Sequence, residues 1–112
     1  QDQRWDKAGP LLQTFLKQHP ESRWRVQAMY LLGECLYNLE RYRSAIRQYQ
    51  KVVDRDETGE WAARAMLKQG FAFAEMGTVA ESKVFLSDVI RLYPDSPEAG
   101  KARKKQEQLN NE

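Results

Sequence analysis

Apolar residues recur every three or four positions along most of the chain, which is the spacing of one face of an α-helix. One such stripe consists of Ala28, Leu31, Leu32, Cys35, Leu36 and Leu39. The next stripe follows the short polar break at Glu40 and Arg41, and it consists of Ala45, Ile46, Tyr49, Val52 and Val53. No segment shows the sustained alternation between turn signals that is typical of a strand. The pattern therefore predicts an all-α fold. Its expected helices cover residues 4–18, 23–38, 41–54, 59–75, 78–92 and 97–109.

The stripes repeat with a period of 37 residues. The residues that fall in register include Ala28, Ala65 and Ala102; Met29 and Met66; Trp24 and Trp61; Gly33 and Gly70; Leu12, Tyr49 and Leu86; and Phe15, Val52 and Val89. Pro20 and Pro94 close two of the periods, whereas Glu57 stands at the corresponding position of the middle period. Because each period holds two stripes, it predicts a pair of helices, and repeated pairs predict a stacked, solenoid-like array.

Breaker and capping residues refine the expected helix ends. Gly77 is expected to end the fourth helix, because glycine adopts the left-handed conformation at low cost. Thr78 stands three residues before Glu81, a spacing that predicts a capping box at the start of the next helix. Pro10 lies inside the first stripe and removes one helical hydrogen bond, so we expect that helix to kink or to start near Ala8.

Small residues at fixed positions give each period a recognisable signature. The first copy reads Met29-x2-Leu32-Gly33-x2-Leu36, then Ala45-x3-Tyr49; the second reads Met66-x2-Gln69-Gly70-x2-Phe73, then Ser82-x3-Leu86. These copies resemble the tetratricopeptide repeat family, whose signature is W-x2-L-G-x2-Y followed by A-x3-F and P. The resemblance implies a right-handed α-solenoid of about six helices. In such a fold Gly33 is expected to face Ala45, and Gly70 to face Ser82, where the helices of a pair approach most closely.

The frame of the repeats defines one domain over residues 1–112. Within it, residues 4–20 match only the second helix of a repeat, residues 23–57 and 60–94 match full repeats, and residues 97–109 match a first helix that caps the array. We therefore expect the chain to be a segment of a longer protein. A half-repeat without its first helix would leave an apolar stripe uncovered, and this predicts weak self-association through the N-terminal end.

Two phrases point to a narrower resemblance. Residues 18–22 (QHPES) and 92–102 (LYPDSPEAGKA) resemble the C-terminal repeat domain of the CpoB/YbgF family of Tol-Pal-associated periplasmic proteins. That resemblance implies a periplasmic location and a role in coordinating envelope constriction during cell division, with a TolA-like protein or a peptidoglycan synthase as partner. The shorter pattern Tyr93-Pro94-x-Ser96-x2-Ala99 within the second phrase also resembles other bacterial envelope proteins with such repeats, including BamD-like outer-membrane assembly lipoproteins. An assembly lipoprotein, or a larger sensor or secretion protein, therefore stays open as an alternative.

Charge and hydropathy exclude several other partners. The chain carries 18 Lys and Arg residues against 16 Asp and Glu residues, and its net charge of +2 is too small for a nucleic-acid footprint. The basic run at residues 101–105 has no aromatic residues between its charges, so a solvated helix face explains it better. The longest apolar runs fall far short of the ~20 residues of a membrane span, so we expect no direct membrane insertion.

The residues available for chemistry are few. Cys35 is the only cysteine and His19 the only histidine, so a His/Cys metal site is not expected. Cys35 lies on an apolar stripe and is predicted to be a small buried hydrophobic residue. No acid and base residues stand in a catalytic arrangement. We therefore expect a binding protein without a catalytic residue, metal or cofactor, and an enzyme domain is the disfavoured alternative.

Partner binding is expected on the first helices of the pairs. In tetratricopeptide arrays these helices line a concave groove that receives a peptide or domain of a partner protein. Transferring that geometry through the positions of Gly33 and Gly70 gives the expected groove residues Gln27, Tyr30, Glu34, Tyr37, Asn38, Arg64, Leu67, Phe71, Glu75, Lys101 and Lys104. The alternative is that Tyr30, Leu67 and Phe71 pack between successive repeats.

Overall fold

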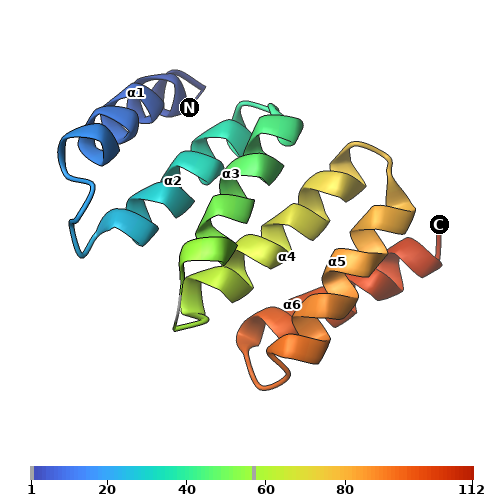
Figure 1. Cartoon of the computed structure of the whole chain (residues 1–112). Coiled ribbons are helices and arrows are strands. Elements are labelled where there is room, and N and C mark those ends of the chain that lie inside the picture. The colour runs from blue at the N-terminus through green and yellow to red at the C-terminus, as the bar shows by residue number, and fades with distance from the viewer. Residues whose placement is uncertain (1, 57) are drawn as a thin grey trace.

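Six α-helices follow one another in the computed structural model, which describes residues 2–56 and 58–112 (Figure 1). They are α1 (Asp2–Gln18), α2 (Arg25–Asn38), α3 (Tyr42–Arg55), α4 (Glu60–Glu75), α5 (Val79–Leu92) and α6 (Pro97–Asn110). Every boundary lies within two residues of the position expected from the sequence. The prediction of an all-α chain of six helices is therefore confirmed. Glu57, where the middle repeat was expected to end, lies outside the described residues.

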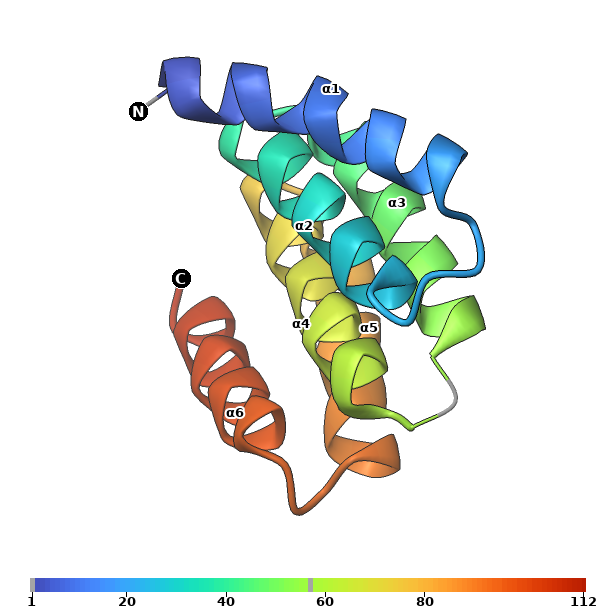
Figure 2. The same cartoon turned by 90° about the vertical axis from the view of Figure 1, so that its left-hand side faces the viewer.

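Consecutive helices pack against each other, and the first helices of the pairs also form a row. α2 pairs with α3 and α4 pairs with α5, while α2 also contacts α4, and α4 contacts α6. In the part of the chain that the structure describes, α1, α3 and α5 make no such contacts with one another. Figure 2 shows α3 and α5 behind α2 and α4. The row of α2, α4 and α6 therefore presents one shared surface.

The two repeat glycines lie where the helices of a pair approach most closely. A Cβ atom added to Gly33 would lie 2.6 Å from the ring of Tyr49, and one added to Gly70 would lie 2.8 Å from a methyl group of Leu86. Both distances are shorter than van der Waals contact allows, so any side chain at these positions would displace a buried neighbour. The large residue of the second helix fills the space that each glycine leaves.

The small residues expected opposite the glycines are buried, and one of them contacts its glycine directly. Ala45 and Ser82 are fully buried, and the atoms nearest the added Cβ atoms belong to Tyr49 and Leu86, so each glycine approaches the large residue of the second helix most closely. Ser82 does contact the glycine backbone, because its Oγ donates a hydrogen bond of 2.7 Å to the carbonyl oxygen of Gly70. The small side chain of Ser82 therefore lets the backbone of α4 approach α5, and the space beside Gly70 is filled by Leu86.

Two equivalent helix ends adopt the left-handed conformation. Glu40 has φ +61°, and Gly77, 37 residues later, has φ +80°. In both turns the N–H of this residue and that of the next residue donate to carbonyls three and five positions back. Gly77 thus ends α4 as predicted. The predicted capping box with Glu81 is wrong, because the Thr78 hydroxyl donates instead to the carbonyl oxygen of Phe73 at 2.9 Å.

α1 runs without interruption from Asp2 to Gln18 and includes Pro10. The expected start near Ala8 is therefore wrong. Proline at this position forfeits one backbone hydrogen bond, but Pro10 is exposed at the edge of a hollow between α1 and α2, and α1 packs against α2. Packing of an apolar face contributes more to helix stability than a single backbone bond.

The core divides into two clusters, each centred on a second helix. Around α3 the buried residues are Met29, Ala45, Tyr49, Val52 and Ala65. Around α5 they are Leu67, Leu86, Val89, Ala102 and Leu109. Cys35 is 2% exposed, and burial raises the pKa of its thiol, so its predicted role as a small buried hydrophobic residue is confirmed. Among the described helices, none has the length and hydrophobicity required to cross a membrane.

Gln69 occupies a position that the repeat signature reserves for an apolar residue. Its side chain is 1% exposed and reaches from α4 to α3. The Nε2 group donates to the carbonyl oxygen of Ile46 at 3.1 Å and to the side-chain oxygen of Gln50 at 3.0 Å. These bonds satisfy the amide nitrogen and offset part of the cost of burying the side chain, whereas the Oε1 atom is buried without a hydrogen-bond partner among the described residues.

Candidate partner-binding face

The row of α2, α4 and α6 carries a mixed set of aromatic and charged side chains. Residues spaced three or four positions apart along a helix lie on the same side of it. Because α2 contacts α4 and α4 contacts α6, the equivalent stripes of these helices lie next to one another. We call this surface the inner face; it comprises Glu34, Tyr37, Asn38, Arg64, Lys68, Phe71, Glu75, Lys101 and Lys105.

Lys68 lies at the centre of the inner face and connects α4 to α2. Its Nζ atom lies 4.1 Å from the centre of the Tyr37 ring and 3.6 Å from the Oε1 atom of Glu34. The hydroxyl of Tyr49, on α3, donates a hydrogen bond to the same Oε1 atom. The side chains of Lys68 and Glu34 are only 22% and 21% exposed, so water screens these interactions less than it screens a surface pair.

Tyr37 is half-buried and its ring is held on two sides. The ring of Tyr42, at the start of α3, lies edge-on at a centroid distance of 5.3 Å, and Lys68 covers one of the two faces. Burial, with the nearby negative charge of Glu75 and then Tyr42 and Glu34, raises the pKa of Tyr37 to about 12. The phenol is therefore neutral at physiological pH and offers an aromatic body with a polar tip.

Tyr30 and Arg64 form a second group near the starts of α2 and α4. The ring of Tyr30 lies 5.7 Å from that of Tyr49 and 5.3 Å from that of Trp61, so Tyr30 packs between repeats, as the alternative interpretation proposed. Burial raises the pKa of Tyr30. The guanidinium of Arg64 lies 4.4 Å from the Trp61 ring centre, and its Nε atom lies 3.9 Å from Glu98 on α6.

Leu67 does not line the inner face, so this expectation is wrong. Its side chain is 4% exposed and packs in the cluster that includes Ala102 of α6. The same position of the repeat is Tyr30 in α2 and Lys104 in α6. The following first helix packs against this residue: α4 packs against Tyr30, and α6 packs against Leu67. Lys104 is exposed, and it belongs to α6, the last helix of the row. Lys104 therefore lies at the end of the row rather than on the inner face.

α4 and α6 form the basic end of the inner face. Phe71 is half-buried, and the Nζ atom of Lys105 lies 5.9 Å from the centre of its ring. Lys101 is exposed on α6, and Glu75 is exposed near the end of α4. An exposed carboxylate thus lies near the end of α4, while two lysines of α6 place positive charge on this part of the inner face.

The remaining expected residues lie at opposite ends of α2. Asn38 is exposed at the end of the helix, where its Nδ2 group donates to the carbonyl oxygen of Glu34 at 2.7 Å. Gln27 is half-buried near the start of α2 and lines two hollows, one shared with α1 and one shared with the start of α4. Gln27 therefore lies at the start of α2, between α1 and the first turn of α4.

The sequence reading omitted Lys68 and Lys105, which the structure places on the inner face. The signal was present, because Lys68 lies one helical turn after Arg64 and three residues before Phe71, on the same stripe. Lys105 lies 37 residues after Lys68 and occupies the equivalent repeat position in α6. The equivalent residue in α2 is the apolar Leu31, so the charge at this position is absent from the first helix of the row.

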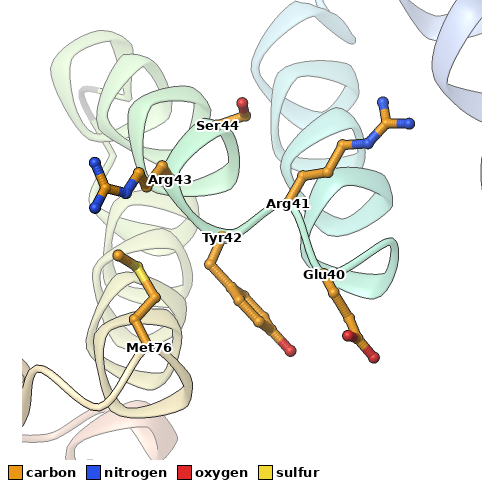
Figure 3. A pocket seen from close by; sticks show the side chains of 6 residues that line it. All are labelled: Glu40, Arg41, Tyr42, Arg43, Ser44 and Met76. Carbon is orange, nitrogen blue, oxygen red and sulfur yellow. The ribbon is translucent and has the colours of Figure 1, made fainter.

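The surface hollow at the α2–α3 turn lacks the features of a small-molecule site. Figure 3 shows its lining residues, Glu40, Arg41, Tyr42, Arg43, Ser44 and Met76. The guanidinium groups of Arg41 and Arg43 point in opposite directions, so the polar groups do not converge on one ligand (Figure 3). Across the described residues, no group of three or more His, Cys, Asp or Glu side chains is placed to hold a metal ion.

Two protein-family models match the chain, and both are described as tetratricopeptide repeat. The first covers residues 1–60, which is more than half of the chain, and the second covers residues 64–96. Together the matches extend over α1, α2, α3, most of α4 and α5. No curated protein sequence matches the chain.

Proposed function

The chain belongs to the tetratricopeptide repeat family, and from this we propose that it is a protein-interaction scaffold whose inner face binds a segment of a partner protein. The observation that carries this proposal is the arrangement of Lys68, Tyr37 and Glu34 between α2 and α4. These side chains are held by contacts within the protein, so a partner that binds there orders few additional rotamers.

The inner face also defines the chemistry of the partner segment. Tyr37 and Phe71 are half-buried aromatic residues that suit an apolar or aromatic anchor of the partner. Lys101 and Lys105 suit acidic residues of the same segment, whose charge would increase the rate of association. We therefore expect an extended or helical segment that carries an apolar anchor followed by acidic residues.

We further propose that the partner belongs to the bacterial cell envelope. The support is the two phrases at residues 18–22 and 92–102, which resemble Tol-Pal-associated periplasmic proteins. On this proposal the chain acts in the periplasm during division, and a TolA-like protein or a peptidoglycan synthase is the first candidate partner. An outer-membrane assembly lipoprotein of the BamD kind is the competing proposal, and the identity of the captured partner separates the two.

Site-specific photo-cross-linking in cells tests where the partner binds. A photoreactive amino acid is placed at Glu75 or Lys101, both exposed on the inner face, and at Val84 as a matched control. Val84 lies on α5 and is 57% exposed, so it samples solvent on a different helix row. We expect one shared adduct from Glu75 and Lys101 and none from Val84. An adduct from Val84 alone would contradict the assignment of the inner face.

A further inference from the structure

A basic hollow lies between the second helices α1 and α3. Both helices pack against α2, and they make no such contacts with each other in the described part of the chain (Figure 1). The space between them has a volume of about 340 Å³, and residues of α2 form its base. Each helix contributes one basic side chain to the lining, namely Lys17 of α1, Arg25 of α2 and Lys51 of α3. We call this space the outer hollow.

The three basic groups of the outer hollow lack acidic partners, since none of them forms an ion pair among the described residues. Lys17 and Lys51 are exposed, and Arg25 is half-buried. The Nη1 group of Arg25 donates to the carbonyl oxygen of Pro20 at 3.0 Å, whereas its Nε atom is buried without a hydrogen-bond partner in the part of the chain that the structure describes. An unpaired buried donor is unfavourable, so an acceptor that reached this guanidinium would be bound favourably.

The base of the outer hollow is apolar and carries one fixed amide. Leu16, Met29 and Leu32 line it, and the last two are buried. Gln48 of α3 also lines the hollow and is 8% exposed. Its Nε2 group donates to the carbonyl oxygen of Met29 at 3.2 Å, which holds the amide in place. An apolar base with a few polar groups around it is the usual composition of a ligand site.

The corresponding gap one repeat later, between α3 and α5, is bridged by a side chain. Gln69 of α4 stands at the repeat position of Leu32, and its amide donates across the gap to Gln50 of α3 at 3.0 Å. Leu32 has no donor group and cannot cross the first gap in this way. Phe85 stands at the position of Gln48 and is the larger side chain. The open space therefore follows from the residues of the first gap rather than from the repeat geometry alone.

The charge of the outer hollow is also specific to the first gap. The residues that stand at the positions of its three basic groups one repeat later are Asp54, Ala62 and Asp88. Three positive charges are thus replaced by two negative charges at the second gap. Repetition of the sequence does not require this difference, so the positive charge is a property of this one place in the array.

A further repeat before α1 would leave the outer hollow open. Its first helix would join the row of α2, α4 and α6, and α2 already holds that relation to the gap between α3 and α5. Gln50 and Asp54, at the rim of that gap, are nevertheless exposed. The described second helices make no contacts with one another, so a second helix beyond α1 would not reach α3. The accessibility of Lys17 and Lys51 therefore does not depend on what precedes α1.

We propose that the outer hollow binds an acidic segment of a partner protein, with one carboxylate among Lys17, Arg25 and Lys51 and the neighbouring apolar side chain on Leu16 and Leu32. A guanidinium and two ammonium groups provide charge-assisted hydrogen bonds to a carboxylate. The lining contains no aromatic side chain on which a nucleic-acid base could stack. The basic groups surround a recess, which suits a single side chain of a peptide better than the plane of a membrane surface. This site is separate from the inner face.

A short acidic peptide tests the chemistry of the ligand. The probe is a blocked peptide in which glutamate and leucine alternate over five residues, and it is titrated into the isotopically labelled 112-residue chain. We expect it to shift backbone amide signals of residues 13–17, 25–32 and 48–51 in nuclear magnetic resonance spectra. One control peptide has glutamine in place of each glutamate, and another has serine in place of each leucine. We expect each control to bind about fivefold more weakly or less.

Variants of the chain locate the binding. Lys17→Gln and Lys51→Gln each remove one charge of the outer hollow, and Lys7→Gln removes the same charge from an exposed residue of α1 outside the lining. Leu32→Gln introduces the residue that bridges the second gap and leaves the net charge unchanged. We expect probe binding to weaken about threefold or more in the first two variants and in Leu32→Gln, and to be unchanged in Lys7→Gln. Circular dichroism checks that each variant folds.

Four results would overturn the proposal. The first is absence of probe binding to the unaltered chain, and the second is equal binding by the probe and the glutamine peptide. The third is an equal loss of binding in Lys7→Gln and Lys51→Gln, which would show that only net charge attracts the probe. The fourth is a loss of binding in Lys101→Glu with none in Lys17→Gln or Lys51→Gln, which would place the probe on the inner face.

A membrane surface is the remaining competitor for these basic groups. Co-sedimentation with phosphatidylglycerol vesicles tests it on the unaltered chain and on Lys51→Gln. We expect no difference between the two proteins. Vesicle binding that Lys51→Gln abolishes, together with absence of probe binding, would assign the basic groups to a lipid surface and contradict the proposal.

Discussion

The ammonium group of Lys68 on α4 lies 4.1 Å from the centre of the Tyr37 ring on α2. A related contact occurs one step later, where Lys105 of α6, the equivalent of Lys68, lies 5.9 Å from the ring centre of Phe71 on α4; Phe71 stands at the repeat position of Glu34 rather than of Tyr37. A lysine of one first helix thus reaches over an aromatic ring of the preceding first helix at both junctions. Cation–π contacts of this kind link successive repeats.

The close approach at Gly70 leads to a prediction about stability. Gly70→Leu should destabilise the domain by roughly 1–3 kcal/mol or more, because even a Cβ atom would lie 2.8 Å from a methyl group of Leu86. Gly100→Leu is the matched control, since a Cβ atom at this exposed helical glycine would meet nothing within 4 Å. Urea denaturation measures both variants. Equal midpoints for the two would show that α4 and α5 are not packed as described.

The two left-handed helix ends predict opposite effects of paired substitutions. Glu40→Gly should stabilise the chain by about 1 kcal/mol, because glycine adopts φ near +61° without the steric cost that glutamate incurs. Gly77→Ala should destabilise it by about the same amount. No atom lies within 4 Å of an added Cβ at Gly77, so the effect isolates the backbone conformation. Thermal unfolding tests the pair, and a stabilising Gly77→Ala would refute the assignment of this turn.

The helical stripes and the 37-residue period were sufficient to predict the fold. Because amphipathic spacing and the repeat agree with each other, all six helices were located within two residues of their ends. The local hydrogen bonds were less predictable. Thr78 has the sequence of a capping residue, yet its hydroxyl donates back to Phe73 because the preceding turn brings that carbonyl within reach. Sequence spacing does not determine such competition between neighbouring acceptors.

The binding face was predicted less completely than the fold. Transfer by register identified Tyr37, Glu34 and Arg64, but it treated every first helix as equivalent. Leu67 is buried because α6 packs over it, and Lys104 at the same position is exposed in the last helix. Whether such a position faces a partner or another repeat depends on what packs next to it. That information lies in the tertiary arrangement rather than in the spacing.

Asp56 anchors the start of α4 and makes its stability depend on pH. Its Oδ1 atom accepts from the N–H and hydroxyl of Thr58 at 3.1 and 2.7 Å, and its Oδ2 atom accepts from the N–H of Ala62 at 2.8 Å. Burial alone would raise the pKa of Asp56, but these hydrogen bonds outweigh it, so the pKa lies below its ordinary value of 3.8. The carboxylate therefore stabilises the fold above that value, and the contribution disappears as pH falls through the folded pKa.

We therefore expect Asp56→Ala to reduce the free energy of unfolding by about 1 kcal/mol at neutral pH, as loss of a helix cap does. The difference from the unaltered chain should shrink as the pH is lowered from roughly 4 towards 2. Urea denaturation at several pH values measures it. A difference that stays constant over this range would show that the charge of Asp56 has no part in capping α4.

Lys101→Glu tests the charge of the inner face. Lys101 is exposed on α6, so its replacement should leave the unfolding midpoint nearly unchanged. Association with an acidic partner segment should slow, and the difference from the unaltered chain should diminish as salt is added. Stopped-flow association at low and high ionic strength measures this effect. Identical rates at low salt would mean that the partner does not approach α6.

Tyr37 is the aromatic residue on which the assignment of the inner face depends most. Tyr37→Ala also removes the packing against Tyr42, so a modest loss of stability is expected and has to be measured separately. Lys68→Glu provides a second variant, because it reverses the charge beside Tyr37 and retains the aromatic ring. Val84→Ala, at an exposed residue of α5, is the control for both variants.

The most direct test is calorimetric titration of the partner segment captured by cross-linking into the unaltered chain and these three variants, under conditions in which all four are folded. Binding of a partner at the inner face predicts that Tyr37→Ala weakens affinity by at least ~1 kcal/mol, that Lys68→Glu also weakens it, and that Val84→Ala does not. Unchanged affinity in both Tyr37→Ala and Lys68→Glu would contradict the account.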